Sequence, residues 1–85
     1  FGGKERTVKL LVKNNLAGVI IDRFGKDVMM IPADNEHFTV SVDIHVSKQF
    51  LGWVFSLGEN IKIIGPEDVV EMMKGEIGRL VEQYK

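Results

Sequence analysis

The sequence first constrains function through what it lacks. Its 85 residues contain no cysteine, which excludes a disulfide framework, a thiol nucleophile and a cysteine-based metal site. No apolar run approaches the roughly 20 residues that a membrane-spanning helix needs, and no export signal opens the chain. The 11 basic residues are balanced by 12 acidic ones, so a net charge of -1 gives no footprint for a phosphate backbone. We therefore expect a soluble, cytoplasmic protein that does not grip DNA by itself.

The chain does contain enough apolar sequence for one small core. Hydrophobic residues make up 45% of it, and a domain of this size buries about 60–65% of its unfolded surface. The opening Phe1-Gly2-Gly3 has no pattern, so residues 1–5 are expected to be the remnant of a linker. Residues 6–85 are expected to form a single domain of a longer protein.

Alternating apolar and polar residues predict two half-buried strands. In the first, Arg6 to Lys13, Val8, Leu10 and Val12 face one way, and Leu11 is the exception on the polar side. The second strand shows the clearest alternation in the chain. Its apolar face comprises Phe38, Val40, Val42, Ile44 and Val46.

Two shorter apolar runs predict two more strands. Asp27 to Ile31 is one, and Pro32 should end it or place it at a sheet edge, because proline cannot donate to a ladder. The turn residues 33–36 that follow predict an antiparallel hairpin with the next strand. Asn60 to Ile64 is the other.

Capping residues predict where three helices begin and end. Asn14 and Asn15 are preferred N-caps for a helix from Leu16 to a stop at Gly25. Ser47 should cap a second helix, which Gly58 closes. The third helix should start with Pro66 at its first position and extend to Tyr84.

This order of elements predicts an α+β fold of the ferredoxin-like βαββαβ type. In that fold an antiparallel sheet of four strands carries two helices on one face, and here a third, C-terminal helix is added. The other face of the sheet is left open. It is the first candidate for a ligand or domain-contact surface, although solvated residues on an open face have the same composition. The candidate residues are Lys9, Leu11, Lys13, Thr39, Ser41, Asp43 and His45.

The last helix is the second candidate. Its apolar residues recur at steps of three and four, as in a short coiled-coil seam. Two interpretations stay open, since this stripe could pack on the domain's own sheet or contact another subunit or domain. The stripe consists of Val70, Met73, Ile77, Leu80 and Tyr84.

Catalytic and cofactor chemistry find no support in the sequence. His37 and His45 lie eight residues apart on one strand, about 26 Å, which is too far to ligate one metal ion. No spaced glycines join a strand to a helix as a phosphate-binding loop, and no nucleophile accompanies His45 and Asp43. We expect no enzyme activity, no metal and no cofactor.

Several strings together resemble a known family. The stretch FLGWVFSLGENIKIIGPEDV, with Trp53 and Gly65-Pro66-Glu67, followed by a long helix ending in VEQY, is similar to the C-terminal extension (WCX) domain of bacterial WYL-domain transcriptional regulators. The resemblance covers the chain from about Val8 onward. It implies a regulator with an upstream helix-turn-helix that reads DNA and a WYL domain that senses an effector.

In that setting this domain would help dimerisation or couple effector sensing to DNA binding. Its partners would be the neighbouring WYL domain and a second subunit, and DNA would be contacted only through the upstream domain. The chain has no Trp-Tyr-Leu string, so no effector-binding residue carries over. Two alternatives stay open: an ACT-like domain that binds a small metabolite through Lys9, Lys13, Ser41 and His45, and a weaker contact of the two lysines with single-stranded nucleic acid.

Overall fold

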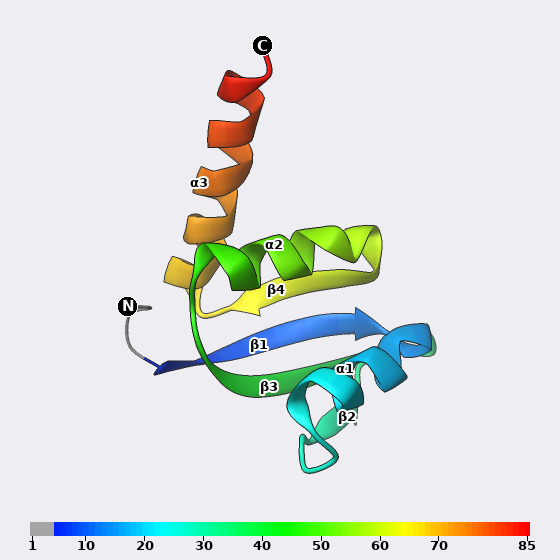
Figure 1. Cartoon of the computed structure of the whole chain (residues 1–85). Helices are drawn as coiled ribbons and strands as arrows, with labels where there is room; N and C mark the ends of the chain where they lie inside the picture. The colour runs from blue at the N-terminus through cyan, green and yellow to red at the C-terminus, as the bar shows by residue number, and fades with distance from the viewer. Residues whose placement is uncertain (1–4) are drawn as a thin grey trace.

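A four-stranded antiparallel sheet is the centre of the computed structural model, which describes residues 5–85 (Figure 1). The predicted α+β class is confirmed. Residues 1–4 of the expected linker lie outside the described residues, and Glu5 already belongs to the first strand. The elements are β1 (Glu5–Lys13), α1 (Ala17–Phe24), β2 (Met30–Pro32), β3 (His37–His45), α2 (Lys48–Ser56), β4 (Ile61–Gly65) and α3 (Glu67–Gln83).

The strand order is β2-β3-β1-β4, and every neighbouring pair is antiparallel. The central pair, β1 and β3, runs in register from Glu5 opposite His45 to Lys13 opposite His37. The predicted hairpin of β2 and β3 is present. On β4 the register shifts by one residue, because Gly65 lies opposite Lys9 and Ile63 lies opposite Leu10, which leaves one extra residue on β4.

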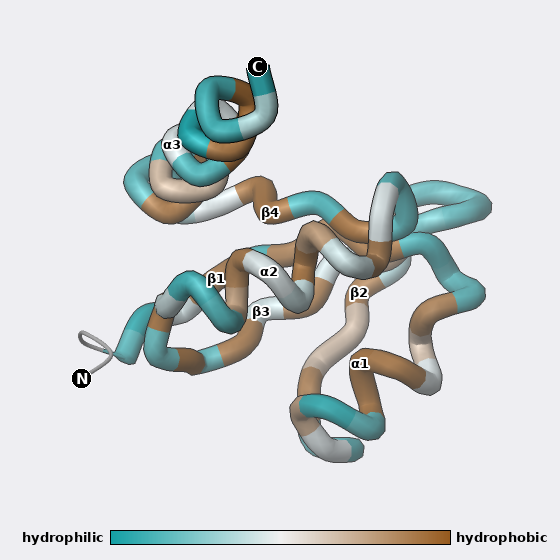
Figure 2. The backbone as a smooth tube through the Cα atoms, turned by 45° about the horizontal axis from the view of Figure 1, so that its top comes forward, coloured by the Kyte–Doolittle hydropathy of each residue, from teal (hydrophilic) through white to brown (hydrophobic). Residues whose placement is uncertain are grey.

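The alternation in β1 and β3 decides which sheet face is buried. Helices α1 and α2 cover the same face of the sheet (Figures 1 and 2). The buried apolar side chains of the strands form one core cluster with residues of these helices. Burying a Val, Leu, Ile or Phe side chain contributes roughly 1.5–3 kcal/mol, so this layer supplies most of the driving force. The buried residues are Val8, Leu10, Val12, Ile20, Phe38, Val40, Val42, Phe50, Leu51, Val54, Ile61, Ile63 and Val69.

The predicted helix-end signals at Gly25, Ser47 and Gly58 are confirmed, and Gly25 is the C-cap of α1 with φ of 94°. Ser47 caps α2, because its hydroxyl accepts a hydrogen bond from the Phe50 backbone N–H at 3.2 Å. Gly58 follows α2 with φ of 66°, a left-handed conformation that favours glycine. The asparagine caps were wrong: Asn14 begins a 3₁₀ turn, and its side-chain amide donates instead to the Asn35 carbonyl at 3.1 Å.

Two predicted boundaries need correction at proline. The strand expected over residues 27–31 is the shorter β2, Met30–Pro32, and Pro32 is its last residue on the outer edge of the sheet. An edge strand tolerates proline because the missing N–H would have faced solvent. Pro66 is not the first helical residue but the N-cap, with φ -71° and ψ 168°, and α3 begins at Glu67.

Helix α3 packs on the domain only near its beginning. Val69 is the one residue of α3 that is buried, and β4 is the element that α3 mainly contacts. The rest of the helix projects away from the sheet and carries the C-terminus at its far end (Figure 1). The interpretation that α3 packs along its own sheet is therefore wrong for most of its length.

Candidate functional site

The open face of the sheet, which is the side that α1 and α2 leave uncovered, carries the residues predicted for it. The β1–β3 register places Lys9 opposite Ser41, and Leu11 opposite Thr39. The β1–β4 register adds Lys62 opposite Leu11, and the hairpin register adds Ile31 opposite Thr39. One row of side chains thus crosses all four strands.

Three lysines surround Leu11 on the open face. Lys9 and Lys13 are its neighbours two residues away on β1, each about 6.6 Å along the strand, and Lys62 lies across from it on β4. Among residues 5–85 none of these three lysines forms an ion pair. We call this set the lysine triad. Three uncompensated ammonium groups around one apolar side chain make this half of the open face suited to an anion.

The opposite half of the open face is chemically different. Thr7 donates a hydrogen bond to Asp43 at 2.5 Å between the hydroxyl and carboxylate oxygens, so this carboxylate is already engaged. His45 lies opposite Glu5. Four residues of β3, about 13 Å, separate His45 from Ser41. The structure therefore places Lys9 opposite Ser41 and leaves Lys13 and His45 four residues from that pair in opposite directions, so the four-residue metabolite site of the prediction is not a single cluster.

His37 has a structural role in the β2–β3 turn. Its Nδ1 lies 2.9 Å from Oδ1 of Asp34, which also accepts from the backbone N–H groups of Glu36 and His37 at 2.8 Å each. The hydrogen bond from the Glu36 N–H, followed by that from His37, lowers the pKa of Asp34 below its usual value. No group of three or more His, Asp or Glu residues in the described chain could hold a metal ion.

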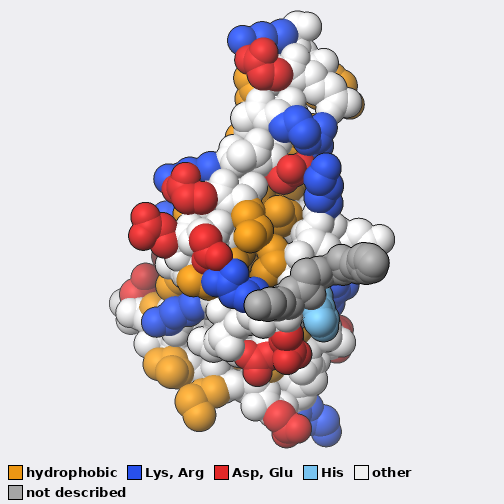
Figure 3. All heavy atoms as spheres, turned by 90° about the vertical axis from the view of Figure 1, so that its left-hand side faces the viewer, with side chains coloured by type: hydrophobic (Ala, Val, Ile, Leu, Met, Phe, Trp, Pro, Cys, Tyr) orange, Lys and Arg blue, Asp and Glu red, His pale blue; other side chains and the backbone are white. Residues whose placement is uncertain are grey.

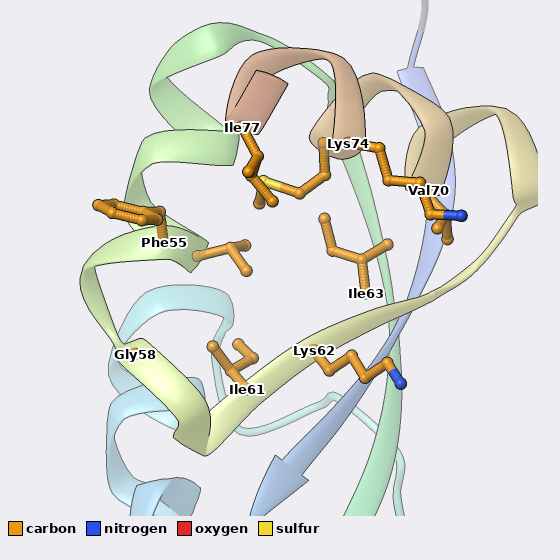
Figure 4. Close-up of a pocket in the computed structure, with 10 residues that line it drawn as sticks. Phe55, Gly58, Ile61, Lys62, Ile63, Val70, Lys74 and Ile77 are labelled. Carbon is orange, nitrogen blue, oxygen red and sulfur yellow. The ribbon is translucent and has the colours of Figure 1, made fainter. Parts of the chain in front are cut away.

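An apolar groove lies on the other side of the molecule, between α2, β4 and α3. We call it the α3 groove. It encloses about 370 Å³ and is bounded by Val54 and Phe55 of α2 and by Ile61 and Ile63 of β4 (Figure 4). Lys62 and Lys74 are its only charged lining residues. On α3 it is lined by Val70, Met73, Lys74 and Ile77.

The α3 groove holds only the first half of the predicted apolar stripe. Val70, Met73 and Ile77 line it, whereas Leu80 borders a second hollow with Leu51 and Phe55 of α2. Tyr84 follows the last helical residue, at the end of the helix that projects beyond the body (Figures 1 and 3). Leu80 is half-buried, and Tyr84 is 78% exposed. We call the five predicted residues the α3 stripe. The stripe is continuous along the helix; α2 borders it as far as Leu80, and Tyr84 lies beyond that contact.

The base of α3 is fixed by an ion pair that the sequence did not suggest. Arg6 of β1 donates two hydrogen bonds to the Asp68 carboxylate, at 2.7 and 2.8 Å. This contact, through its hydrogen bond first and its charge second, raises the pKa of Arg6 and lowers the pKa of Asp68. Asp68 also lies in the first turn of α3, where a negative charge is favoured.

Trp53 is a packing residue between the two sheet-covering helices. Its ring meets Phe24 of α1 edge-on with centroids 5.5 Å apart and lies nearly parallel to Phe50 at 6.1 Å. The Arg23 guanidinium covers it at 4.9 Å. The tryptophan therefore joins α1 to α2.

The sequence patterns did not predict that α2 borders the α3 groove opposite the α3 stripe. Phe55 is 64% exposed on α2 and lines the α3 groove. The only sequence signal for Phe55 was its place next to Val54 in the helical pattern. The way α2 and α3 cross could not be predicted from the spacing of apolar residues within each helix. Lys62 lies on the open face, and its position on an edge strand also brings it to the rim of the groove.

These features define a small α+β domain with an open sheet face and a projecting terminal helix. A model of the WCX domain family matches residues 4–81, and the chain belongs to that family. Comparison with curated proteins gave no match, and comparison with solved structures gave none either. Across residues 5–85 the structure has no helix with the length and apolar character needed to cross a membrane.

Proposed function

We propose that this WCX domain is a non-enzymatic regulatory and self-association module of a bacterial transcriptional regulator. In that protein it couples effector sensing in a neighbouring WYL domain to DNA binding by an upstream helix-turn-helix domain. The family supports the regulatory context. The observation that carries the association role is the α3 stripe, which leaves the body with Ile77 47% and Tyr84 78% exposed. Contiguous exposed apolar surface of this kind marks interaction sites.

Charged substitutions on the stripe test this role. Ile77→Asp and Leu80→Asp replace residues that are not fully buried, so the sheet and its two covering helices should stay folded. We expect each variant to weaken self-association, or docking to the WYL domain, at least tenfold. Sedimentation equilibrium across a concentration series measures the first, and titration with the WYL domain measures the second.

A matched control is Gln49→Glu, which adds a negative charge on an exposed α2 position outside the α3 groove. Circular dichroism of every variant must show a folded protein. If the folded Ile77→Asp and Leu80→Asp proteins associate and dock as tightly as the control, the α3 stripe has no role in either contact.

A second candidate function is the binding of a small anionic metabolite, as in ACT-like domains. The lysine triad favours it, because Lys9 lies opposite Ser41 and Leu11, at the centre of the triad, lies opposite Thr39. A thermal-shift screen with acidic amino acids and nucleotides tests it, since a ligand that binds only the folded state must raise stability. The same screen with a short single-stranded oligonucleotide separates a metabolite from a nucleic-acid contact. If none of these anions stabilises the domain, the binding of an anionic ligand is contradicted and self-association remains the proposed function.

We also propose the ferredoxin-like class for the fold. The strand order supports it, because β3 lies between β1 and β2 while β1 lies between β3 and β4. Helix α1 connects β1 to β2 and α2 connects β3 to β4, so each helix crosses a strand of the other unit.

A further inference from the structure

We propose that the partner of the α3 stripe is the α3 helix of a second copy of this chain, packed antiparallel to it. Each Met73 would lie against the partner's Tyr84 and each Ile77 against the partner's Leu80, around a twofold axis level with residues 78 and 79. This inference rests on the proposed function, since it specifies how the domain self-associates. It assigns the α3 groove an occupant, the aromatic end of the partner's helix.

The spacing of the stripe fits this arrangement. Its steps of three and four divide it into two sets, Val70, Ile77 and Tyr84 against Met73 and Leu80. In an antiparallel pair a member of one set meets a member of the other. Met73 and Tyr84 each lie five and a half residues from the axis, about 8 Å along the helix, so the two contacts form together. Each is made twice by symmetry.

The shape of the molecule selects antiparallel over parallel packing. The wall formed by α2 and β4 stands in front of the first half of the stripe, with Phe55 and Ile63 facing it across the groove (Figure 4). A parallel partner would bring its own wall to the same end of the helix pair, and the two bodies would collide. An antiparallel partner instead presents its projecting end, with the exposed Tyr84, to the walled half.

The exposed aromatic side chains supply about half of the area that a small dimer buries. Phe55 is 64% exposed and Tyr84 78% exposed. An enclosed Phe or Tyr buries 150–250 Å², so these two residues offer on the order of 300 Å² per chain, or roughly 600 Å² per dimer. Specific interfaces start at about 1,200 Å², so the aromatic residues cover about half of that need. Ile77 and Val81 of α3, 47% and 55% exposed, add to this area.

Tyr84 also gives a variant that should not affect folding. Because its side chain is exposed, Tyr84→Ala removes the proposed contact without disturbing the core. We expect the dissociation constant of the dimer to rise at least tenfold, whereas the neighbouring control Gln83→Ala should leave it within twofold. An unchanged dissociation constant for Tyr84→Ala would overturn the proposal.

Disulfide cross-linking tests the direction of packing, and the chain suits it because it has no cysteine of its own. Met73→Cys and Tyr84→Cys chains, one of them carrying a mass tag, are oxidised separately and as a mixture. We expect a cross-linked dimer only in the mixture, since two Met73 positions would be about 16 Å apart along the axis while a disulfide needs Cα atoms within about 7 Å. Asp22→Cys on α1 is the control, and its cross-linked fraction gives the level that random collisions produce.

The outcomes separate this inference from the proposed function. Cross-linking of Tyr84→Cys with itself, above the Asp22→Cys level, means parallel helices and overturns the inference while self-association stands. A dimer by sedimentation that gives no cross-link in the mixture also overturns it, because the contact then lies elsewhere. A monomer at every concentration overturns both the inference and the self-association role.

Discussion

Arg6 and Asp68, 62 residues apart in the sequence, form a two-pronged ion pair that joins β1 to the first turn of α3. The fork of the guanidinium matches the carboxylate, and this geometry fixes direction as well as position. Both groups are solvent-accessible, with side chains 35% and 54% exposed, so their contribution to stability is screened. The main consequence of the pair is the orientation of α3.

The ion pair makes the stability of the domain depend on pH. Arg6 lowers the pKa of Asp68 in the folded state, so the carboxylate stabilises the fold above its unfolded pKa of about 3.9. That contribution is lost as pH falls through the lower folded pKa. We therefore expect Asp68→Asn to be less stable than the unmodified chain at pH 7 and to approach it in stability below about pH 4.

Urea unfolding at several pH values checks this expectation. Glu71→Gln is the control, because Glu71 pairs with Lys74 within the exposed surface of α3 and holds no other element. A deficit of Asp68→Asn that stayed constant from pH 7 to pH 3 would show that the charge of Asp68 does not act through Arg6.

The buried base of α3 should dominate its attachment. Val69 is fully buried, so Val69→Ala removes two methyl groups from the core and should cost about 2 kcal/mol of unfolding free energy. The same substitution at Val81, which is 55% exposed, should change it by less than about 0.5 kcal/mol. Denaturant unfolding of both variants tests this difference in unfolding free energy. The midpoints are measured at low protein concentration to avoid association. Equal losses would contradict attachment through the first turns alone.

Replacing either of two glycines within α3 by alanine should stabilise the domain. A Cβ added at Gly75 or Gly78 would meet no neighbour within 4 Å, so alanine should raise stability by up to about 1 kcal/mol at each position. Gly58→Ala is the contrasting case, because its φ of 66° is strained for alanine and the same change should destabilise. Thermal unfolding compares the three. If Gly75→Ala and Gly78→Ala both destabilise the monomer, the helix interior is less open than the structure has it.

The lysine triad should respond to anions. Pyrophosphate at constant ionic strength should raise the melting temperature of the domain, and Lys9→Gln combined with Lys13→Gln should remove most of that rise, since two of three positive charges around Leu11 are lost. The control is Lys26→Gln, an exposed lysine in the turn after α1. Equal shifts in the double variant and the control would show that this surface has no affinity for anions.

The sheet and its covering helices were predictable because each depends on local periodicity. Alternation placed Val8 and Val40 in the core, and the Ser47 cap was found from residue type alone. The asparagine cap failed because Asn14 has a tertiary alternative: its side chain binds the Asn35 carbonyl and its backbone N–H the Glu36 carbonyl. A competing partner 21 residues away leaves no local signal.

For the candidate surfaces, too, the features set by local periodicity were predictable and those set by tertiary contacts were not. The open-face residues followed from strand parity, so Lys9 and Ser41 were expected together and are found together. The α3 stripe was also read correctly as one line of apolar residues, but its relation to the body was not. The angle at which α3 leaves the sheet depends on the ion pair of Arg6 and on the burial of Val69, and neither is a property of the helix sequence itself.

Attachment at one end has a mechanical consequence for α3. The helix is 17 residues long, or about 25 Å, and both of its firm contacts lie in the first turn. It therefore acts as a lever with its pivot at Asp68 and Val69. A tilt of only about 10° at the pivot moves the far end sideways by about 4 Å, which is about three quarters of the 5.4 Å helical pitch. Small rearrangements around Arg6 are thus magnified into displacements of Tyr84 that are large enough to exchange one set of contacts for another.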